Sequence, residues 1–265
     1  MISWIKKELE DYKYLLRAVP AYTVTLFVLS VVCMNLLANK ELFVLTRANG
    51  SVLLAMDCGF TISWISFLCM DCICKRWGAK AATKISILAI VTNLGVTIVF
   101  NILGNFATGH WGQYYTTLYA DGGNETIANI ANTAINNTFK GSWAVVLGSA
   151  AAMFVSSIVN SLLNTTIGKV THDNNSFKKF AIRSFISTGV AQWVDNIVFA
   201  FLLFKILYPD WTILSLVINA TIGAFFELLC EIVLSPIGYK MSLDWAKENV
   251  GKDYLDRQSK NVKTI

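Results

Sequence analysis

The stretch "RSFISTGVAQWVDNIVFAF", residues 183–201, places a carboxylic acid inside a segment that otherwise suits lipid. Its second half is nearly all apolar, yet Asp195 lies within it, with Gln192 about one helical turn before it and Asn196 directly after it. A charged side chain at the centre of a bilayer costs about 2.5 to 3.5 kcal/mol on insertion scales, so such residues usually face a protein interior or a water-filled cavity. The stretch therefore predicts a membrane helix that lines a cavity.

The composition of the whole chain is typical of a membrane protein. Of its 265 residues, 55% are hydrophobic and only 15% are charged, and the mean hydropathy is +0.53. A soluble domain usually carries about a quarter charged residues. No Pro- or Gly-rich linker divides the chain. We therefore expect an all-α integral membrane protein with one transmembrane domain over residues 1–265.

Six apolar segments are long enough to cross about 30 Å of hydrocarbon as helices that rise 1.5 Å per residue. The six transmembrane helices are predicted near residues 20–38, 51–74, 84–105, 142–167, 182–207 and 212–236. The longest connection, residues 106–141, is predicted to be an external loop. It is interpreted as an interfacial helix or lid over the outer mouth, or as a surface excursion.

The basic residues predict the orientation of the helices. Most of the 22 lie in the N-terminal segment, in the connections between helices 2 and 3 and between helices 4 and 5, and in the C-terminal tail. The other side receives only Lys40, Arg47, Lys140 and Lys205. Because cytoplasmic segments carry the excess of Lys and Arg, both termini are predicted to be cytoplasmic.

Several classes of function lack support in the sequence. Contact with anionic lipid heads is enough to explain the formal net charge of +5 without a nucleic-acid partner. There is no phosphate-binding loop, no dinucleotide-binding glycine pattern and no helical zinc motif. The "CMDCIC" stretch, residues 69–74, is interpreted as reduced thiols at a helix end rather than as a metal site. We expect no metal and no cofactor.

Further charged residues lie inside or at the ends of the apolar segments. Glu227 and Glu231 are four residues apart, so they share one face of the last helix. Glu227, like Asp195, lies near the middle of the membrane, which favours a functional role for both. Asp71 and Lys40 close their segments, where location at the membrane interface explains a charge equally well.

Polar side chains also follow the fifth helix. Arg183, Ser187, Asp195 and Phe199 fall near one stripe of it, although Arg183 can also extend to the headgroups. Asparagines lie in three other helices, at Asn35, Asn93, Asn101, Asn160 and Asn164. A single asparagine more often links helices than binds a ligand. Together they predict a polar interior.

Four segments resemble the signature segments of the queuosine precursor transporters, also known as the vitamin uptake transporter (VUT) family. They are "NLLANK" (35–40), "DCICKRWGAKAA" (71–82), "RSFISTGVAQWVDNIVF" (183–199) and "EIVLSPIGY" (231–239). Members are six-helix proteins of the bacterial inner membrane that import 7-deazapurine bases for tRNA modification. The resemblance implies this fold, this localisation and a nucleobase-like substrate.

The resemblance also implies a substrate-binding site. Residues that fit the family pattern are Asn35, Ala38 and Lys40 in the first helix, Asp71 and Gly78 at the end of the second, Arg183, Ser187, Thr188, Gln192, Asp195 and Phe199 in the fifth, and Pro236 in the sixth. The chain departs from the pattern at Lys75, Asn160 and Glu227. Glu227 stands where members usually have Lys.

The site residues suggest how such a base is bound. A carboxylate at Asp195 would accept the N–H and NH₂ of a guanine-like edge, with Gln192 and Asn196 at the remaining edge atoms. Glu227, with Glu231 one turn away, would favour a cationic substituent. The 7-aminomethyl base or queuine therefore suits this chain better than the neutral 7-cyano base.

Two other functions are compatible with the sequence. One is the substrate-binding component of a modular vitamin uptake system for another small heterocycle, which needs a separate ATPase for energy. The other is a membrane enzyme in which Glu227 and Glu231 perform acid–base chemistry, but no nucleophile or metal cage accompanies them. We expect a transporter rather than an enzyme. Its energy coupling and a homodimeric state stay open.

Overall fold

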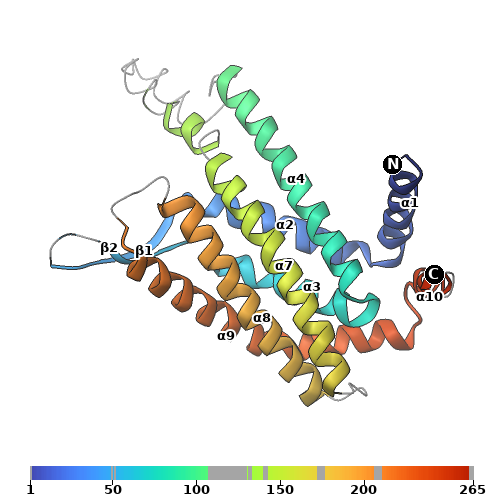
Figure 1. The fold of residues 1–265 in the computed structure, drawn as a ribbon. Coiled ribbons are helices and arrows are strands. Elements are labelled where there is room, and N and C mark those ends of the chain that lie inside the picture. Colours follow the sequence, from blue (N-terminus) through green and yellow to red (C-terminus); the bar gives the residue numbers. More distant parts are fainter. Residues whose placement is uncertain are drawn as a thin grey trace, which may run out of the picture.

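The computed structural model describes residues 2–48, 50, 52–106, 130, 133–139, 143–171, 177–205 and 211–262. Most of this part of the chain is helical, and long helices run side by side along the molecule (Figure 1). The elements in chain order are α1 (Ile2–Ala18), α2 (Ala21–Leu37), β1 (Glu41–Thr46), β2 (Val52–Asp57), α3 (Phe60–Trp77), α4 (Ala79–Phe106), α7 (Trp143–Thr171), α8 (Phe177–Ala200), the π-helix η1 (Phe201–Lys205), α9 (Ile213–Lys247) and α10 (Lys252–Val262).

The prediction of a helical membrane protein is confirmed. Helices α2, α3, α4, α7, α8 and α9 overlap the six predicted segments. Four of them, α4, α7, α8 and α9, are long and apolar enough to cross a membrane. A fifth span results if α1 and α2, which are bent by 107° at their junction, count as one. Six spans and cytoplasmic termini stay predictions.

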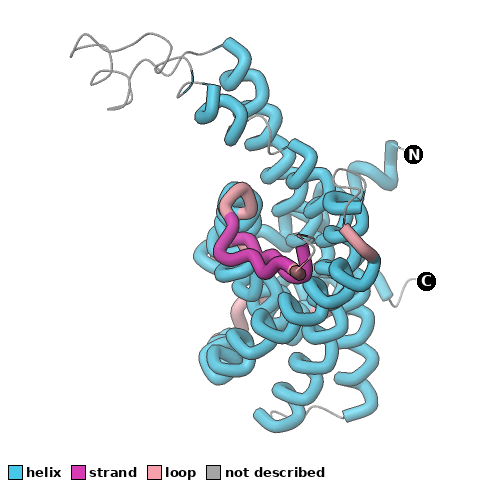
Figure 2. Tube along the Cα trace, turned by 90° about the vertical axis from the view of Figure 1, so that its left-hand side faces the viewer, coloured by secondary structure: helices cyan, strands magenta, loops and turns pink. Residues whose placement is uncertain are grey.

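Residues 52–57, which were predicted to begin the second membrane helix, form strand β2 instead. This strand pairs antiparallel with β1. The hairpin lies at the opposite end of the bundle from the two termini (Figure 1) and faces the viewer in Figure 2. Side chains of α9 supply hydrogen bonds to β2. Asn219 Oδ1 accepts from Ala55 N at 2.8 Å, and Ser215 Oγ donates to Val52 O at 2.9 Å. These hydrogen bonds stabilise residues 52–57 as a strand rather than as a helix. Their partners are distant in the sequence, so the local pattern of residues does not reveal them.

Gly59 allows the hairpin to pass close to α2. A Cβ atom at this position would lie 2.3 Å from the carbonyl oxygen of Met34, which is far inside van der Waals contact. The Gly59 amide also donates to Asp57 Oδ1 at 2.6 Å. Because Gly59 has no side chain, the chain can approach α2 closely here, and the Gly59 amide holds Asp57 at the junction of α2, β2 and α3.

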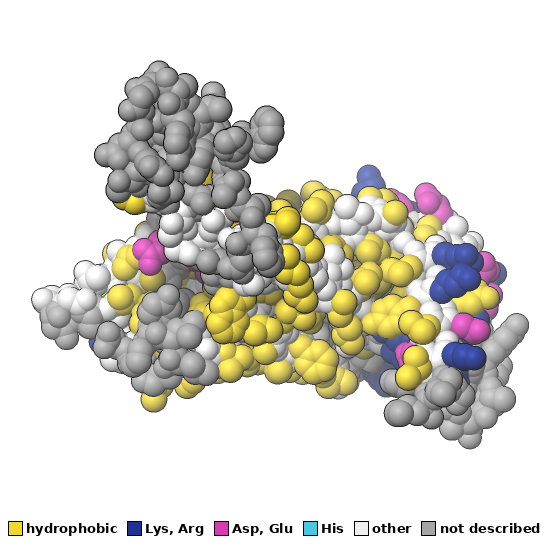
Figure 3. Space-filling view, turned by 90° about the horizontal axis from the view of Figure 1, so that it is seen from above, with side chains coloured by type: hydrophobic (Ala, Val, Ile, Leu, Met, Phe, Trp, Pro, Cys, Tyr) yellow, Lys and Arg dark blue, Asp and Glu magenta, His cyan; other side chains and the backbone are white. Residues whose placement is uncertain are grey.

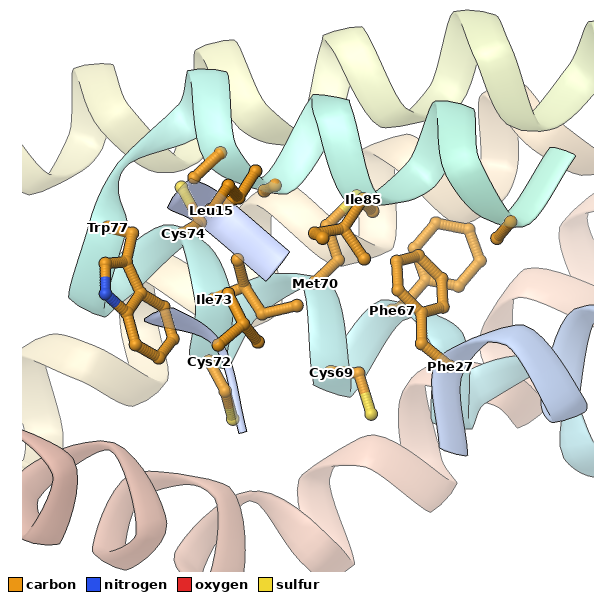
Figure 4. Close-up of a cluster of buried hydrophobic side chains, with 14 of the residues drawn as sticks. Leu15, Phe27, Phe67, Cys69, Met70, Cys72, Ile73, Cys74, Trp77 and Ile85 are labelled. Carbon is orange, nitrogen blue, oxygen red and sulfur yellow. The ribbon is translucent and has the colours of Figure 1, made fainter. Parts of the chain in front are cut away.

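The hydrophobic core lies where α3 packs between α1, α2 and α4. Leu15, Phe27, Ile73 and Ile85 are fully buried there (Figure 4). Cys69, Cys72 and Cys74 are buried in the same cluster, so their thiols pack as small hydrophobic groups. Among the described residues, no group of three or more His, Cys, Asp or Glu side chains is arranged to hold a metal ion.

The two ends of the chain meet at one end of the bundle. Lys84 of α4 pairs with Glu8 of α1 at 2.6 Å and also with Asp11. Arg257 of α10 pairs with Glu10 at 2.8 Å. Charged side chains gather at this end, whereas hydrophobic side chains cover the middle of the molecule (Figure 3). This distribution is typical of a protein with a lipid-facing band and a polar end.

Candidate functional site

A small pocket lies between the helices close to the hairpin. Its volume is about 60 Å³. Polar lining residues come from α2, β2, α3, α7, α8 and α9, and they are Asn35, Asp57, Ser63, Ser149, Asp195, Asn196 and Glu227. Met34, Ala38, Gly59, Phe60 and Phe199 complete the wall. Three of the twelve lining residues are carboxylic acids, and the lining contains no Lys, Arg or His. We therefore call it the acidic pocket.

The acidic pocket adjoins a larger cavity beneath the hairpin. This hairpin cavity has a volume of about 570 Å³, which is within the usual range of about 300–1,000 Å³ for small-molecule sites. Both share Ala38, Asp57 and Phe199 as lining residues. Because they share these residues, we treat the hairpin cavity and the acidic pocket as one candidate binding site. The cavity is large enough for a heterocycle, whose polar atoms could then face the acidic pocket.

Hydrogen bonds hold two of the pocket carboxylates in place. Ser156 Oγ donates to Asp195 Oδ1 at 2.7 Å. Asn196 Nδ2 donates to Glu227 Oε2 at 3.1 Å, and Ser63 Oγ donates to Glu227 Oε1. The third acid, Asp57, lies at the end of β2, where burial raises the pKa of its carboxyl. These bonds orient the acids before any ligand arrives.

Acceptor atoms remain available in the acidic pocket. Asn35 Nδ2 donates to the carbonyl of Val31 at 2.9 Å, which leaves its Oδ1 as an acceptor. Oδ2 of Asp195 accepts no hydrogen bond from the described residues. A pocket with open acceptors and three carboxyl groups suits a ligand that has several N–H donors or a positive charge.

A second polar group lies farther along the bundle, toward the termini. Asp71 of α3 is fully buried and accepts hydrogen bonds from α7 and α8. Asn160 Nδ2 and Asn164 Nδ2 donate to its Oδ1 at 2.8 and 2.9 Å. Thr188 Oγ1 donates to its Oδ2 at 2.9 Å, and Ser184 Oγ donates to the same atom.

Glu231 of α9 completes this second group. It is also fully buried, and its Oε1 lies 2.9 Å from Ser184 Oγ. We call Asp71 and Glu231 the buried carboxyl pair. Arg183 of α8, with 7% of its surface exposed, lies close enough to act electrostatically on Asp71.

The structure places ten of the twelve predicted site residues in two groups. The acidic pocket contains Asn35, Asp195, Asn196, Phe199 and Glu227. The group around the buried carboxyl pair contains Asp71, Arg183, Ser187, Thr188 and Glu231. Gln192 lies on α8 between the two groups, and Lys40 is exposed on the turn between α2 and β1. Their roles in binding stay predictions.

Sequence reasoning missed several pocket residues. Asp57 was hidden because it was assigned to the start of a helix, although an acid directly after the apolar run "VLLAM" is an available signal. Ser63 and Ser149 of the pocket, and Ser156, which bonds Asp195, gave no signal, since serine is common in membrane helices. The predicted external loop, residues 106–141, lies mostly outside the described residues.

Comparison with known proteins gives a family match. A sequence model described as "Putative vitamin uptake transporter" matches residues 57–241, which is more than two thirds of the chain. The matched range contains both polar groups apart from Asn35. No curated protein and no solved structure matches the chain.

Proposed function

The chain belongs to the vitamin uptake transporter family, and we propose that it imports a 7-deazaguanine-type queuosine precursor with a basic amine across the bacterial inner membrane. The 7-aminomethyl base and queuine belong to this class. Family membership supports transport as the activity. The observation that supports this choice of substrate is the acidic pocket, with Asp57, Asp195 and Glu227 in its wall.

The base edge is assigned to Asp195. Its Oδ2 is available, and Ser156 holds the other oxygen at 2.7 Å. A guanine-like edge presents a ring N–H and an NH₂ group side by side, and a carboxylate accepts such a pair in parallel. Hydrogen bonds to a charged group contribute about 1.5–3 kcal/mol each. Asn35 Oδ1 offers a further acceptor, and Phe199 offers an aromatic face.

The amine is assigned to Glu227. Glu227 is only 4% exposed, and Ser63 and Asn196 each donate a hydrogen bond to one of its carboxyl oxygens. A fixed carboxylate in a poorly hydrated pocket attracts an ammonium group more strongly than it would in water. A neutral nitrile gains no such attraction. The charge of the pocket therefore favours the aminomethyl base over the cyano base.

Uptake by cells tests the proposal directly. Cells that lack both synthesis and transport of deazaguanine bases would receive the wild-type protein, Asp195→Asn, or the control Asp256→Asn on the exposed side of α10. At equal membrane expression, wild type and the control should accumulate labelled 7-aminomethyl base. Asp195→Asn should reduce uptake about tenfold or more. Failure of wild type to take up any deazaguanine base would overturn the proposal.

Purified protein in liposomes separates a carrier from a binding subunit. A carrier should exchange labelled base across the liposome membrane without any partner protein, and the base should be recovered chemically unchanged. Binding without exchange would instead indicate the substrate-binding component of a modular system. Recovery of an altered base would indicate an enzyme.

A further inference from the structure

The buried carboxyl pair has a hydrogen-bond pattern that two ionised acids cannot satisfy. Ser184 Oγ contacts Asp71 Oδ2 and also lies 2.9 Å from Glu231 Oε1. A serine hydroxyl has one proton, so it can donate to one carboxylate only. The Ser184 oxygen must therefore accept a hydrogen bond from the second carboxyl group. The bridge is complete only when one of the two acids carries a proton.

The remaining contacts identify which acid holds that proton. One carboxylate oxygen of Asp71 accepts hydrogen bonds from Asn160 and Asn164. The other oxygen accepts hydrogen bonds from Thr188 and Ser184. Four donors stabilise a carboxylate. Glu231 Oε2 has no hydrogen-bond partner among the described residues. The hydroxyls close to Glu231 are those of Ser184 and Thr188, and both also bond Asp71. A fully buried carboxylate that must share its donors is costly, whereas a carboxylic acid that donates to Ser184 is not. Asp71 is therefore the ionised member and Glu231 the protonated one.

The charges around the pair agree with this assignment. From α8, the Arg183 guanidinium is close enough to Asp71 to favour the ionised form of that acid. From α3, the Cys72 and Cys74 thiols lie near the pair, and Lys75 lies over the rings of Phe180 and Tyr239 at 5.1 and 5.6 Å. On α9, Glu227 is one turn away. From α7, the described contacts are the amides of Asn160 and Asn164.

Polar side chains connect the pair with the acidic pocket. Glu227 and Glu231 lie one helical turn apart on the same face of α9. On α8, Gln192 lies one turn from Thr188 and one turn from Asn196, so it occupies the level between the two groups. It is fully buried, and neither its amide nitrogen nor its oxygen has a partner among the described residues. A buried amide with open donors and acceptors can form hydrogen bonds to a ligand or to water that enters from the pocket.

We propose that Glu231, paired with Asp71 through Ser184, is a proton-binding site that couples proton entry to substrate import; this inference rests on the proposed transport function. Glu231 binds one proton from the pocket side and later releases it toward the terminal end of the bundle. Loss of the proton leaves two carboxylates facing each other in a dry space, and their repulsion separates α3 from α9. The proton therefore controls which packing of these helices is stable.

A pH gradient across liposomes tests the coupling. With the membrane potential held at zero, an inward gradient of one pH unit should drive up to about tenfold accumulation of labelled 7-aminomethyl base for one proton per substrate. A protonophore should abolish the accumulation. Glu231→Gln keeps the size and can still donate to Ser184, but it cannot bind and release a proton, so its accumulation of base should no longer respond to the gradient. The matched control Glu248→Gln, at the exposed end of α9, should keep the response.

The outcomes separate the coupling from the transport function. Exchange by wild type without stimulation by the gradient overturns the proton site and leaves the transport function intact. Stimulation that persists in Glu231→Gln also overturns it. Infrared spectroscopy of the substrate-free protein in lipid at neutral pH gives an independent test. A carboxylic-acid band should be present in wild type and Glu248→Gln and be reduced in Glu231→Gln. A wild-type band that Glu231→Gln leaves unchanged contradicts the proposal, even if no base is transported.

Discussion

Asn196 of α8 donates a hydrogen bond of 3.1 Å to Glu227 of α9, and both side chains line the acidic pocket. Ser63 of α3 bonds the other carboxylate oxygen. Three helices thus fix a single acid beside the larger cavity. Because the carboxyl is already oriented, a ligand amine does not have to reorganise it, and the charge at this position should decide which ligand charge the pocket accepts.

Replacing Glu227 by Lys reverses that charge. Glu227→Lys should lower uptake of the 7-aminomethyl base relative to the 7-cyano base at least tenfold, since a pair of charges about 4 Å apart contributes about 4 kcal/mol near a protein surface. Competition between the two labelled bases measures the ratio. Glu248→Lys provides the control, because it makes the same change at an exposed position. An unchanged ratio in Glu227→Lys would remove Glu227 from the selection of substrate charge.

The second prediction concerns the close contact between α7 and Arg183. A Cβ atom at Gly168 would lie 3.0 Å from Arg183 Nη1 and 3.2 Å from its Cδ. Gly168→Ala should therefore displace the guanidinium at a cost of about 1–3 kcal/mol, which exceeds the gain of about 0.5–1 kcal/mol from Ala in a helix, so Tm in detergent should be lower than that of Gly95→Ala. In Gly95→Ala, the added methyl meets nothing within 4 Å, so its Tm should be unchanged or higher. Equal Tm values for the two variants would contradict the packing at Gly168.

The third prediction concerns the hairpin. Asn219→Ala removes the acceptor of Ala55 N and the donor to Leu53 O. An unsatisfied buried amide costs about 1–3 kcal/mol, so hydrogen exchange in residues 52–57 should become about tenfold faster or more. Thr221→Ala, on the same helix, should leave the hairpin unchanged, because Thr221 bonds Val217 and Trp193. Hairpin exchange at the wild-type rate in Asn219→Ala would show that α9 does not hold β2.

The fourth prediction tests how α1 is held. Lys84 is buried and paired with Glu8 and Asp11, so Lys84→Ala removes the nearest positive charge from both acids. Removal of one member of a buried pair costs about 3–5 kcal/mol. We expect a lower Tm and faster proteolysis of α1. Lys80→Ala should change little, since Lys80 is 64% exposed and 3.9 Å from Glu8. Similar effects of the two variants would show that burial of Lys84 does not matter.

The polar groups of the interior were only partly predictable. Asp195, Glu227 and Glu231 could be selected because the cost of charge in lipid makes each of them an exception in its segment. Their division into an acidic pocket and a buried carboxyl pair could not be predicted, since it depends on which of their neighbours face them from other helices. Ser184 is an example: only packing of α3, α8 and α9 brings its hydroxyl to Asp71 and Glu231 at once.

A helical membrane protein, and the approximate positions of its long helices, could be predicted from the amino-acid sequence alone, because hydrophobic length and the cost of buried charge are local properties of the chain. The strand at residues 52–57, and the position of Asp57 beside Asp195 and Glu227 in one pocket, depend on the packing of the whole chain. Those outcomes depend on Asn219 and Ser215, more than 150 residues away, which provide hydrogen bonds that the hairpin cannot make by itself.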